Sequence, residues 1–346
     1  MGSRVSRANP RVSVVMTAYQ DLRFIDAAVK SVLAQTYADF EMIIVDDGTN
    51  RPDVFTRLAG LDARIRVMSL DQNTGTFAAA NRAIADARGE IIARLDADDL
   101  AKPTRLARLV AALDADSGLG FVGSWAARIS ETDEFIDVWQ APVTDLQVRW
   151  AILFHNPLCH STVAFRRKCF DAVGGYNATM RQSGDYELWW KMLAICRTGI
   201  IPEILTCYRV NSCGLTAGNL PDARQRTDPL RCQSWKRLGV EYEPQLVPRL
   251  VELLTGVQIS DASLRVRTCR TAFQLLRGFL VASQRPPGNI DDAAAKTAQI
   301  GNCRSRSRKS GHRVHEPAPA VVALLASRSR FGAGRAAGNT FTVPAG

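Results

Sequence analysis

Short apolar segments alternate with amphipathic segments from Val12 to about Gly123, and this alternation constrains the fold more than any other feature. Val12–Thr17 and Phe40–Val45 are runs of apolar and β-branched residues, which is typical of strands buried on both faces of a sheet. Between them, apolar residues recur at helical spacing from Phe24 to Leu33. Strands that alternate with helices form βαβ units. The sequence therefore predicts an α/β protein, a three-layer α/β/α sandwich with a mainly parallel central sheet.

The same patterns predict the remaining elements. Helices are expected over residues 53–61, 75–88, 103–114, 145–154 and 185–196, and strands over 64–69, 90–95, 119–124, 161–166 and 199–209. A change of rhythm after residue 123 predicts an antiparallel hairpin between residues 128 and 139. Residues 222–283 predict two or three helices with one apolar stripe, which is formed by Leu246, Leu250, Leu253 and Leu254.

Composition divides the chain into regions. We expect a flexible N-terminus over residues 1–9, one α/β domain over 10–220 with halves at 10–124 and 125–220, a helical extension over 221–283 and a basic tail over 284–346. The net charge of +10 belongs to the C-terminal third, because residues 229–346 hold 18 Lys and Arg against 7 Asp and Glu, whereas residues 1–228 hold 26 against 27. The tail has too few apolar residues to build a core and is predicted to be disordered. Because the first two thirds are neutral, nucleic acid is not an expected partner.

Cysteine usage and hydropathy indicate the compartment. No apolar run approaches the roughly 20 residues of a membrane span, and no secretory signal is visible. The eight cysteines have irregular spacing and no C-x-x-C pair, which argues against a zinc site and a disulfide framework. We therefore expect a cytoplasmic protein with reduced thiols. The basic tail suggests peripheral contact with the anionic inner face of the membrane, although a passive solvated extension is the alternative.

The strongest candidate site follows the strand predicted at residues 90–95, where Asp96, Asp98 and Asp99 lie within four positions. Ligands of parallel α/β sheets bind beyond the carboxyl ends of the strands. Carboxylates packed this closely raise one another's pKa unless a cation shares them, and Mg²⁺ or Mn²⁺ prefers such oxygens and can bridge to a diphosphate. The alternative is that they are solvated turn residues that cap the next helix.

Asp46, Asp47 and Gly48 close the second strand in a similar way. Asp-Gly alone is ordinary turn chemistry. Beside a second acidic strand end in the same sheet, however, it favours one wall of a nucleotide site.

An ordered series of motifs then supports a family resemblance. The motifs are Ser13–Tyr19, Ser31–Tyr37, Val45–Thr49, Asn73–Gly75, Ala80–Arg82, Leu95–Asp99, Asn156–Arg167, Gly174–Asn177, Gly184–Trp189 and Cys207–Asn211. Together they resemble the family 2 inverting glycosyltransferases of the GT-A fold, of the bacterial surface-polysaccharide type. The resemblance covers about residues 10–215. Each motif is loose by itself, but the ordered set is specific.

The resemblance implies a nucleotide-sugar donor, with a UDP-sugar as the first expectation. It implies a donor pocket formed by Thr17, Tyr19, Asp47, Asp96 and Asp98, with Asp47 on the base and Asp96 near the ribose. It also implies a divalent metal, Mg²⁺ or Mn²⁺, on the diphosphate, held by Asp98 with Asp99 in support and with Asn211, whose oxygen can still coordinate, as a further ligand. The acceptor would be a hydroxyl of a glycan or of a lipid-linked sugar.

The resemblance also implies that Asp185 is the general base, and its place at the start of a predicted helix fits this role, because the helix dipole favours an ionised carboxylate. The alternative is that Asp185 only caps that helix. His160 is open to two interpretations, a ligand contact or a structural hydrogen bond. Trp189 and Trp190 could stack on an acceptor sugar, although at least one is expected in the core.

The sequence departs from the family pattern at Thr17, Gln20, Gly184 and Asn211, where the family often has Pro, Asn, Glu and His. Two alternatives to a glycosyltransferase therefore stay open. One is a nucleotide-sugar or glycan-binding protein with impaired catalysis, which the changes at Gly184 and Asn211 favour. The other is a sugar nucleotidyltransferase, which would need a Gly-rich phosphate loop that the segment 16–21 does not supply.

Overall fold

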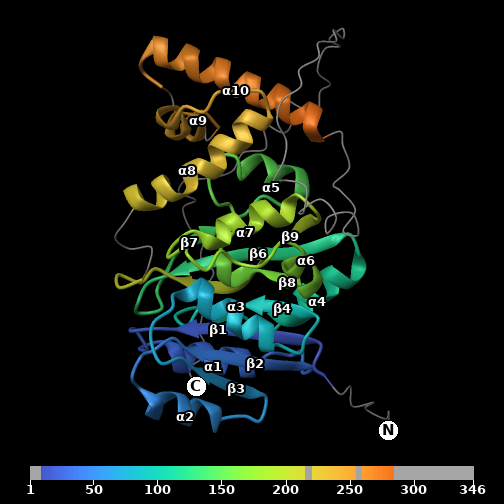
Figure 1. Ribbon diagram of the computed structural model, residues 1–346, viewed down its shortest axis with the longest axis vertical. Coiled ribbons are helices and arrows are strands. Elements are labelled where there is room, and N and C mark those ends of the chain that lie inside the picture. Colours follow the sequence, from blue (N-terminus) through green and yellow to red (C-terminus); the bar gives the residue numbers. More distant parts are fainter. Residues whose placement is uncertain (1–8, 215–219, 255–258, 284–346) are drawn as a thin grey trace.

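The computed structural model describes residues 9–214, 220–254 and 259–283 (Figure 1). The strands are β1 (Val12–Ala18), β2 (Phe40–Asp46), β3 (Ile65–Ser69), β4 (Ile91–Arg94), β5 (Leu100–Ala101), β6 (Leu119–Ile129), β7 (Phe135–Trp139), β8 (Ala164–Arg166) and β9 (Arg197–Arg209). The helices are α1 (Ile25–Leu33), α2 (Pro52–Ala59), α3 (Thr76–Asp86), α4 (Arg105–Ala115), α5 (Asp145–Ala151), α6 (Arg167–Ala172), α7 (Gly184–Leu193), α8 (Leu220–Arg237), α9 (Val247–Leu254) and α10 (Ala262–Ser283). Two 3₁₀ turns, η1 (His160–Thr162) and η2 (Pro244–Leu246), complete the described elements.

All the described strands join one sheet in the order β3-β2-β1-β4-β8-β6-β9-β5, with β7 paired to β6. β1 runs parallel to β2 and β4, β2 to β3, and β6 to β9. β8 is antiparallel to both β4 and β6, so β4 and β6 point the same way. The predicted mainly parallel sheet is therefore confirmed, and the carboxyl ends of β1, β2 and β4 meet at one edge.

Alternate side chains of the central strands enter separate cores on the two faces of the sheet. Val14 and Met16 of β1 pack in one core with α1, α2 and α4, whereas Val15 packs in the other with α3, α6 and α7. Every residue of β2 is buried. Burial on both faces explains why these strands are uninterrupted apolar runs, and it confirms the three-layer prediction.

The helices α8 to α10 lie together at one end of the molecule, next to α5 (Figure 1), and pack around a third core. Leu246 and Leu250 of the predicted apolar stripe are fully buried there, together with Trp235 of α8. The same core contains Trp150 of α5, and Trp235 Nε1 donates to the carbonyl oxygen of Leu153 at 3.2 Å. α8 to α10 are therefore anchored to the α/β region by buried aromatic side chains.

Several boundaries differ from the sequence predictions. β6 is a single strand that joins the predicted strand 119–124 to the first arm of the hairpin. The strand expected from residue 161 begins later because His160–Thr162 forms a 3₁₀ turn. β5 and α6 are short elements that the periodicity did not reveal. The predicted tail at 284–346 and the side chain of Leu254 lie outside the described residues. Within the described part, no helix is long and apolar enough to cross a membrane.

Glu41 in β2 is a buried carboxylate that ties several segments together. It accepts hydrogen bonds from Ser13 Oγ at 2.7 Å, from the Arg88 backbone N–H at 2.7 Å and from Arg66 Nη1 at 2.9 Å. Burial by itself would raise the pKa of Glu41, but these donors outweigh burial and hold the pKa below its usual value. The ionised form is therefore the form that stabilises this part of the sheet.

Glu41→Gln is expected to lower the free energy of unfolding at neutral pH by about 1–3 kcal/mol, because buried donors lose a charged acceptor. A depressed pKa gives stability that is present at neutral pH and lost as the pH falls through the folded pKa. The gap between Glu41→Gln and wild type should therefore shrink in acid, which urea unfolding at a series of pH values measures. Asp53→Asn, which removes an exposed pair with Arg51, is the control. Equal losses in both variants would contradict the assignment.

Candidate functional site

The candidate site lies at the sheet edge where β1, β2 and β4 end. Three further segments reach this edge: η1, the first turn of α7 and the residues after β9. All eight predicted site residues lie in these segments or within a few residues of their ends.

Asp47 organises the segment that leads into α3. Its Oδ1 accepts from Thr74 through both the backbone N–H and Oγ1, each at 2.8 Å. Its Oδ2 accepts from the Gly75 N–H at 2.9 Å and from Asn73 Nδ2 at 2.8 Å. Both oxygens are thus engaged within the protein. The predicted contact of Asp47 with a base stays a prediction, and it requires exchange of one of these bonds.

Gly48 explains how the two turns approach so closely. Its φ is +78°, and a Cβ there would lie 2.6 Å from the carbonyl carbon of Gln72. A glycine is needed at this point both for the backbone conformation and for the contact.

Thr17 and Tyr19 lie on the same side of the edge. Thr17 Oγ1 and Thr76 Oγ1 are 2.8 Å apart, which joins the end of β1 to the start of α3. Tyr19 is 43% exposed, so its ring is available to a ligand. Both positions are compatible with the predicted donor pocket.

Arg94 is the charged group around which the centre of the site is arranged. Its side chain is fully buried at the end of β4. Nη1 donates to the Val15 carbonyl at 2.9 Å, Nε donates to His160 Nε2 at 3.3 Å, and Nη2 pairs with Asp96 Oδ1 at 3.3 Å. One guanidinium therefore links β1, η1 and the acidic turn after β4.

This network fixes the proton on His160. Nε2 faces two donors, Arg94 Nε–H and the Tyr176 hydroxyl at 2.9 Å, so it must accept. The ring proton then lies on Nδ1, which faces Asp96 Oδ2 at 3.2 Å. Of the two interpretations of His160, the structure shows the structural hydrogen bond.

Asp96 stays ionised in this surrounding. Burial would raise the pKa of Asp96, but His160 and Arg94 outweigh burial and hold the pKa well below its usual range. Asp96 thus offers a permanent negative charge beside the donor pocket.

The pKa values of Asp98 and Asp99 are shifted in the opposite direction from that of Asp96. Burial comes first, and the neighbouring carboxylates add to it, so the pKa of each is raised. Asp98 Oδ2 accepts from Asn211 Nδ2 at 3.0 Å, and Asp99 Oδ1 accepts from the Arg209 N–H at 2.7 Å. The buried Oδ2 of Asp99 has no hydrogen-bond partner among the described residues. Crowded carboxylates with an unused oxygen are what a bound cation would relieve.

The donor set therefore fits a hard divalent cation. Among the described residues, no three His, Cys, Asp or Glu side chains form a closed metal cage. Mg²⁺ does not require one, because it commonly takes one or two carboxylates together with water and substrate phosphates. Asn211 turns its amide nitrogen toward Asp98, while its oxygen accepts from the Cys213 N–H at 3.0 Å. Asn211 would have to rotate its amide to serve as the predicted ligand.

Asp185 lies in the first turn of α7 and not at its N-cap, which is Ser183. Its Oδ2 accepts from Asn156 Nδ2 at 2.6 Å, a contact from a distant segment that a simple capping role does not need. Burial raises the pKa of Asp185 and the charge of Asp96 adds to this, whereas the hydrogen bonds from the Tyr186 N–H and from Asn156 oppose it. The result is a carboxylate with increased affinity for a proton, which suits a general base.

The sequence assigned no individual role to some residues of the site, although several of them lie within the motifs of the family resemblance. Asn81 of α3 clamps Tyr176, donating to its carbonyl at 2.8 Å and accepting from its N–H at 3.0 Å. Arg181 Nη1 donates to Asn73 Oδ1 at 3.0 Å. The sequence signal that could have revealed this part of the site was Arg94, a charged residue inside the otherwise apolar run 91–95. The core interpretation of Trp189 is confirmed, since it is fully buried and stacks on Phe121 at 5.4 Å.

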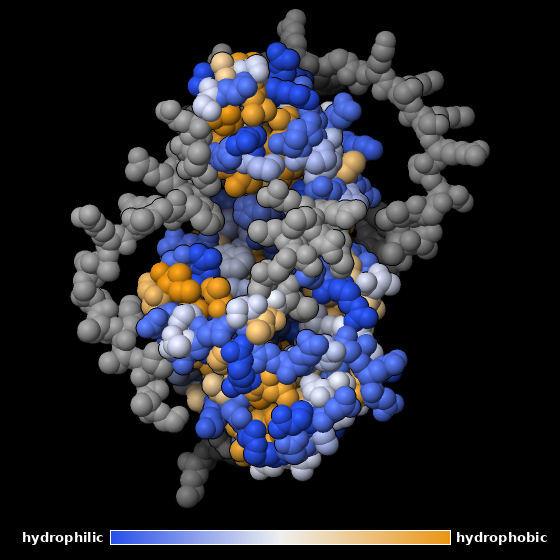
Figure 2. Space-filling model, turned by 90° about the vertical axis from the view of Figure 1, so that its left-hand side faces the viewer, coloured by the Kyte–Doolittle hydropathy of each residue, from blue (hydrophilic) through white to orange (hydrophobic). Residues whose placement is uncertain are grey.

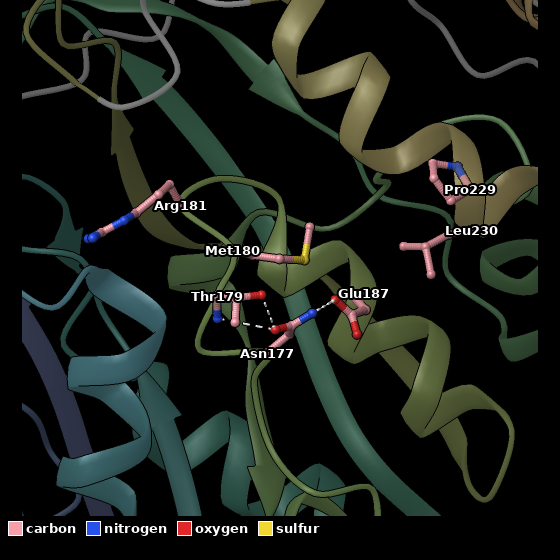
Figure 3. A pocket seen from close by; sticks show the side chains of 7 residues that line it. All are labelled: Asn177, Thr179, Met180, Arg181, Glu187, Pro229 and Leu230. Carbon is pink, nitrogen blue, oxygen red and sulfur yellow. Dashed lines mark hydrogen bonds between the residues drawn. The ribbon is translucent and has the colours of Figure 1, made fainter. Parts of the chain in front are cut away.

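An open pocket of about 580 Å³ lies beside this site, between the segment 177–181, α7 and α8 (Figure 3). Asn177 Nδ2 donates to Glu187 across its floor at 3.0 Å. Arg181 extends away from the other lining side chains, toward the start of α3. The segment 177–181 thus separates the donor side from a pocket with mixed apolar and polar walls.

Comparison with known sequences identifies similar proteins. The model of the family described as Glycosyl transferase family 2 matches residues 13–174. The chain is 40% identical over 279 residues to an uncharacterised glycosyltransferase of a Nostoc species, covering 76% of this chain and 82% of that protein. It is 30% identical over 207 residues to the O-antigen biosynthesis glycosyltransferase WbnJ of Escherichia coli, covering 58% and 80%. An uncharacterised glycosyltransferase of Haemophilus influenzae is 28% identical over 213 residues, which span 58% of this chain and 66% of that protein.

Solved structures share the fold. TarS of S. aureus (residues 1–349, in complex with UDP-GlcNAc) has a TM-score of 0.55 at 14% identity, covering 84% of this chain and 92% of that one. The mannosyltransferase PcManGT of Pyrobaculum calidifontis, in complex with GDP-Man and Mn²⁺, has a TM-score of 0.50 at 20% identity, covering 85% and 81%. These likenesses confirm the predicted fold.

The hydrogen bond from Asn156 to Asp185 generates a direct prediction. Asn156→Ala should raise the pKa of Asp185 further, because that bond favours the ionised carboxylate. Carboxyl-carbon NMR titration of Asp-labelled protein measures the shift, and Asp185→Asn assigns the resonance. Asn177→Ala is the matched control, since it removes a bond to Glu187 on the same helix. An unchanged pKa in Asn156→Ala would refute this account of the base.

Proposed function

The chain belongs to glycosyl transferase family 2, and on that premise we propose that it transfers a sugar with inversion from a nucleoside-diphosphate sugar to an acceptor hydroxyl. One observation carries the proposal. Asp96, which the buried Arg94–His160 network keeps ionised, lies at the same sheet edge as Asp185, and its charge helps to raise the pKa of Asp185. Two carboxylates with separated pKa values in one site indicate separate roles in catalysis.

The donor would lie at the ends of β1, β2 and β4. We propose a UDP-sugar as the first candidate, which the likeness to TarS with UDP-GlcNAc supports, whereas the likeness to PcManGT with GDP-Man keeps a GDP-sugar as the second. Tyr19 offers an exposed ring to the base, and Asp47 holds the segment 73–75 that borders the pocket. Asp96 would accept from the ribose hydroxyls.

Asp98 would hold a divalent cation, with Asp99 supporting it from behind and Asn211 beside it. When bound, such a cation neutralises the charge that develops on the departing diphosphate. Asp99 also fixes Arg209 through its backbone N–H, which keeps the residues after β9 close to Asp98.

Asp185 would act on the acceptor. Its carboxylate takes the proton of the acceptor hydroxyl while that oxygen forms a bond to the anomeric carbon, on the face opposite the diphosphate. The bond from the anomeric carbon to the phosphate oxygen breaks, and the nucleoside diphosphate leaves with the electron pair. Asn156 keeps the carboxylate oriented during this transfer.

The acceptor is proposed to be a hydroxyl of a growing surface glycan or of a lipid-linked sugar, which the likeness to an O-antigen glycosyltransferase supports. A cytoplasmic location and a peripheral contact of the basic tail with the membrane stay predictions, and the tail lies outside the described residues.

A panel of UDP-, GDP-, dTDP- and CMP-sugars tests the donor proposal. Purified protein should release nucleoside diphosphate from one donor (CMP for the last class), more rapidly with Mn²⁺ or Mg²⁺ than without. Asp98→Asn should lose most of the metal response, because it removes a ligand charge. Because the pKa of Asp98 is raised, the metal affinity of wild type should fall as the pH falls, as calorimetry with UDP can measure. No binding of any nucleotide would refute the donor site.

Asp185→Asn is expected to lower transfer by about 10²–10⁴-fold while it leaves donor affinity unchanged, because the base acts on the acceptor. In wild type the rate should fall as the pH falls through the pKa of Asp185, and this limb should lie above the 3.8 of an ordinary Asp. Saturating metal separates this limb from that of Asp98. Retained turnover in Asp185→Asn would exclude it as the base, and metal-dependent nucleotide binding without any turnover would favour the binding-protein alternative.

A further inference from the structure

The outer face of α10 carries an unusual combination of side chains. Its inner face is buried at Thr268, Leu275 and Phe279, of which Leu275 and Phe279 belong to the third core. On the opposite face, Phe273 is 64% exposed and Val281 is 61% exposed. The exposed face also includes Val266, Arg270 and Arg277, and these positions recur at intervals of three or four residues. Large apolar residues in such a stripe are normally buried against something.

The charge of this helix is one-sided. α10 contains four arginines and no acidic residue. Arg267 is paired with Glu243, whereas the structure shows no carboxylate partner for Arg270 or Arg277 among the residues that it describes. In Figure 2, orange apolar patches lie among blue polar side chains at the upper end of the molecule, which α8 to α10 form.

An open groove lies where α10 meets the end of α8. Its volume is about 540 Å³, and Arg237 and Arg277 stand in its walls together with Gln274 and the exposed Val281. Its lining contains no acidic side chain. Gly278 lets the two helices meet closely here, because a Cβ on it would collide with the carbonyl oxygen of Leu238. Two arginines, an amide and an apolar edge suit a phosphate group that is attached to something apolar.

We propose that α10 and the end of α8 form a docking surface for anionic phospholipid. In this arrangement a lipid phosphate lies in the groove between Arg237 and Arg277, while Phe273, Val266 and Val281 enter the boundary between headgroups and acyl chains. A helix with an apolar stripe flanked by arginine binds in the plane of such an interface. The positive charge selects anionic lipid over zwitterionic lipid.

Side-chain contacts connect α8, which carries part of the docking surface, to α7, which carries the candidate base. Arg231 of α8 lies over the ring of Tyr186, 5.5 Å from its centroid, and Tyr186 directly follows Asp185 in α7. α8 is also fixed by the hydrogen bond from Trp235 to Leu153. The surface therefore lies at a fixed position relative to α7. The proposed docking surface does not depend on the identity of the sugar donor or on the transfer reaction. Evidence against the transferase proposal would therefore not contradict it.

Sedimentation of the full chain with vesicles tests the docking surface. Vesicles of phosphatidylcholine mixed with phosphatidylglycerol should bind the protein, and vesicles of phosphatidylcholine alone should bind it weakly. The double variant Arg237→Gln/Arg277→Gln should lose about 25-fold in affinity, since each well-placed arginine at an anionic surface contributes about fivefold. Phe273→Ser should weaken binding without changing the charge.

Matched controls separate this surface from general charge effects. Arg51→Gln/Arg57→Gln removes the same charge from α2, at the opposite end of the molecule (Figure 1), and should leave vesicle binding unchanged. Leu61→Ser is the control for Phe273→Ser. The basic tail is present in every variant, so differences between variants report the groove and stripe.

Four results would overturn the proposal. The first is equal vesicle binding by the groove variants and wild type, and the second is equal loss in the α2 control. The third is that the wild-type protein has the mass of a dimer in solution and that Phe273→Ser makes it a monomer. The apolar stripe would then be covered by a second copy of the chain. The fourth is binding of inorganic phosphate that is abolished by the groove variants while vesicles show no binding, because the site would then take a free anion.

Discussion

The buried guanidinium of Arg94 is the constraint on which the site depends. A charge with no exposed surface must be compensated by acceptors, and Arg94 finds them on three separate segments, at Val15, Asp96 and His160. Arg105 lies beneath it, also fully buried, and donates to the carbonyl oxygens of Arg94 and Ser161. Burial lowers the pKa of Arg105 to about 10, so it remains charged at neutral pH. Two internal cations thus lie against an acidic strand end, which assembles only when the strands are in place.

This arrangement divides the carboxylates into two groups. Asp96, which contacts His160 and Arg94, stays ionised, whereas burial raises the pKa of Asp98, Asp99 and Asp185 and the charge of Asp96 adds to this effect. An ionised group can accept hydrogen bonds without changing state, while a group with raised proton affinity can bind a cation or take up a proton. The different roles of the carboxylates in the proposed mechanism therefore follow from their surroundings: His160 and Arg94 compensate Asp96, whereas burial dominates at Asp98, Asp99 and Asp185.

The sequence predicted the sheet well because its strands are buried on both faces, so Val12–Thr17 and Phe40–Val45 could be read from apolarity alone. It also predicted that the acidic strand ends would face one edge. It could not predict the orientation of Asp47, because two of its four donors are backbone N–H groups of a turn, which have no signature in composition. It also missed α6 and β5, which are too short for any periodicity, and the role of Arg94, whose partner His160 is 66 residues away in the chain.

One departure from the family pattern, Gly184, has a physical reason in this chain. Gly184 stands where the family often has Glu, and a Cβ at this position would lie 2.6 Å from the ring of Phe77. Phe77 in turn packs against the rings of His160 and Tyr176, with centroids 6.3 and 5.3 Å away. Glycine at this position therefore makes room for the ring of Phe77, which packs against His160. Asp185 keeps its position in the first turn of α7. The change at residue 184 is a local exchange of packing, and it is not evidence that catalysis has been lost.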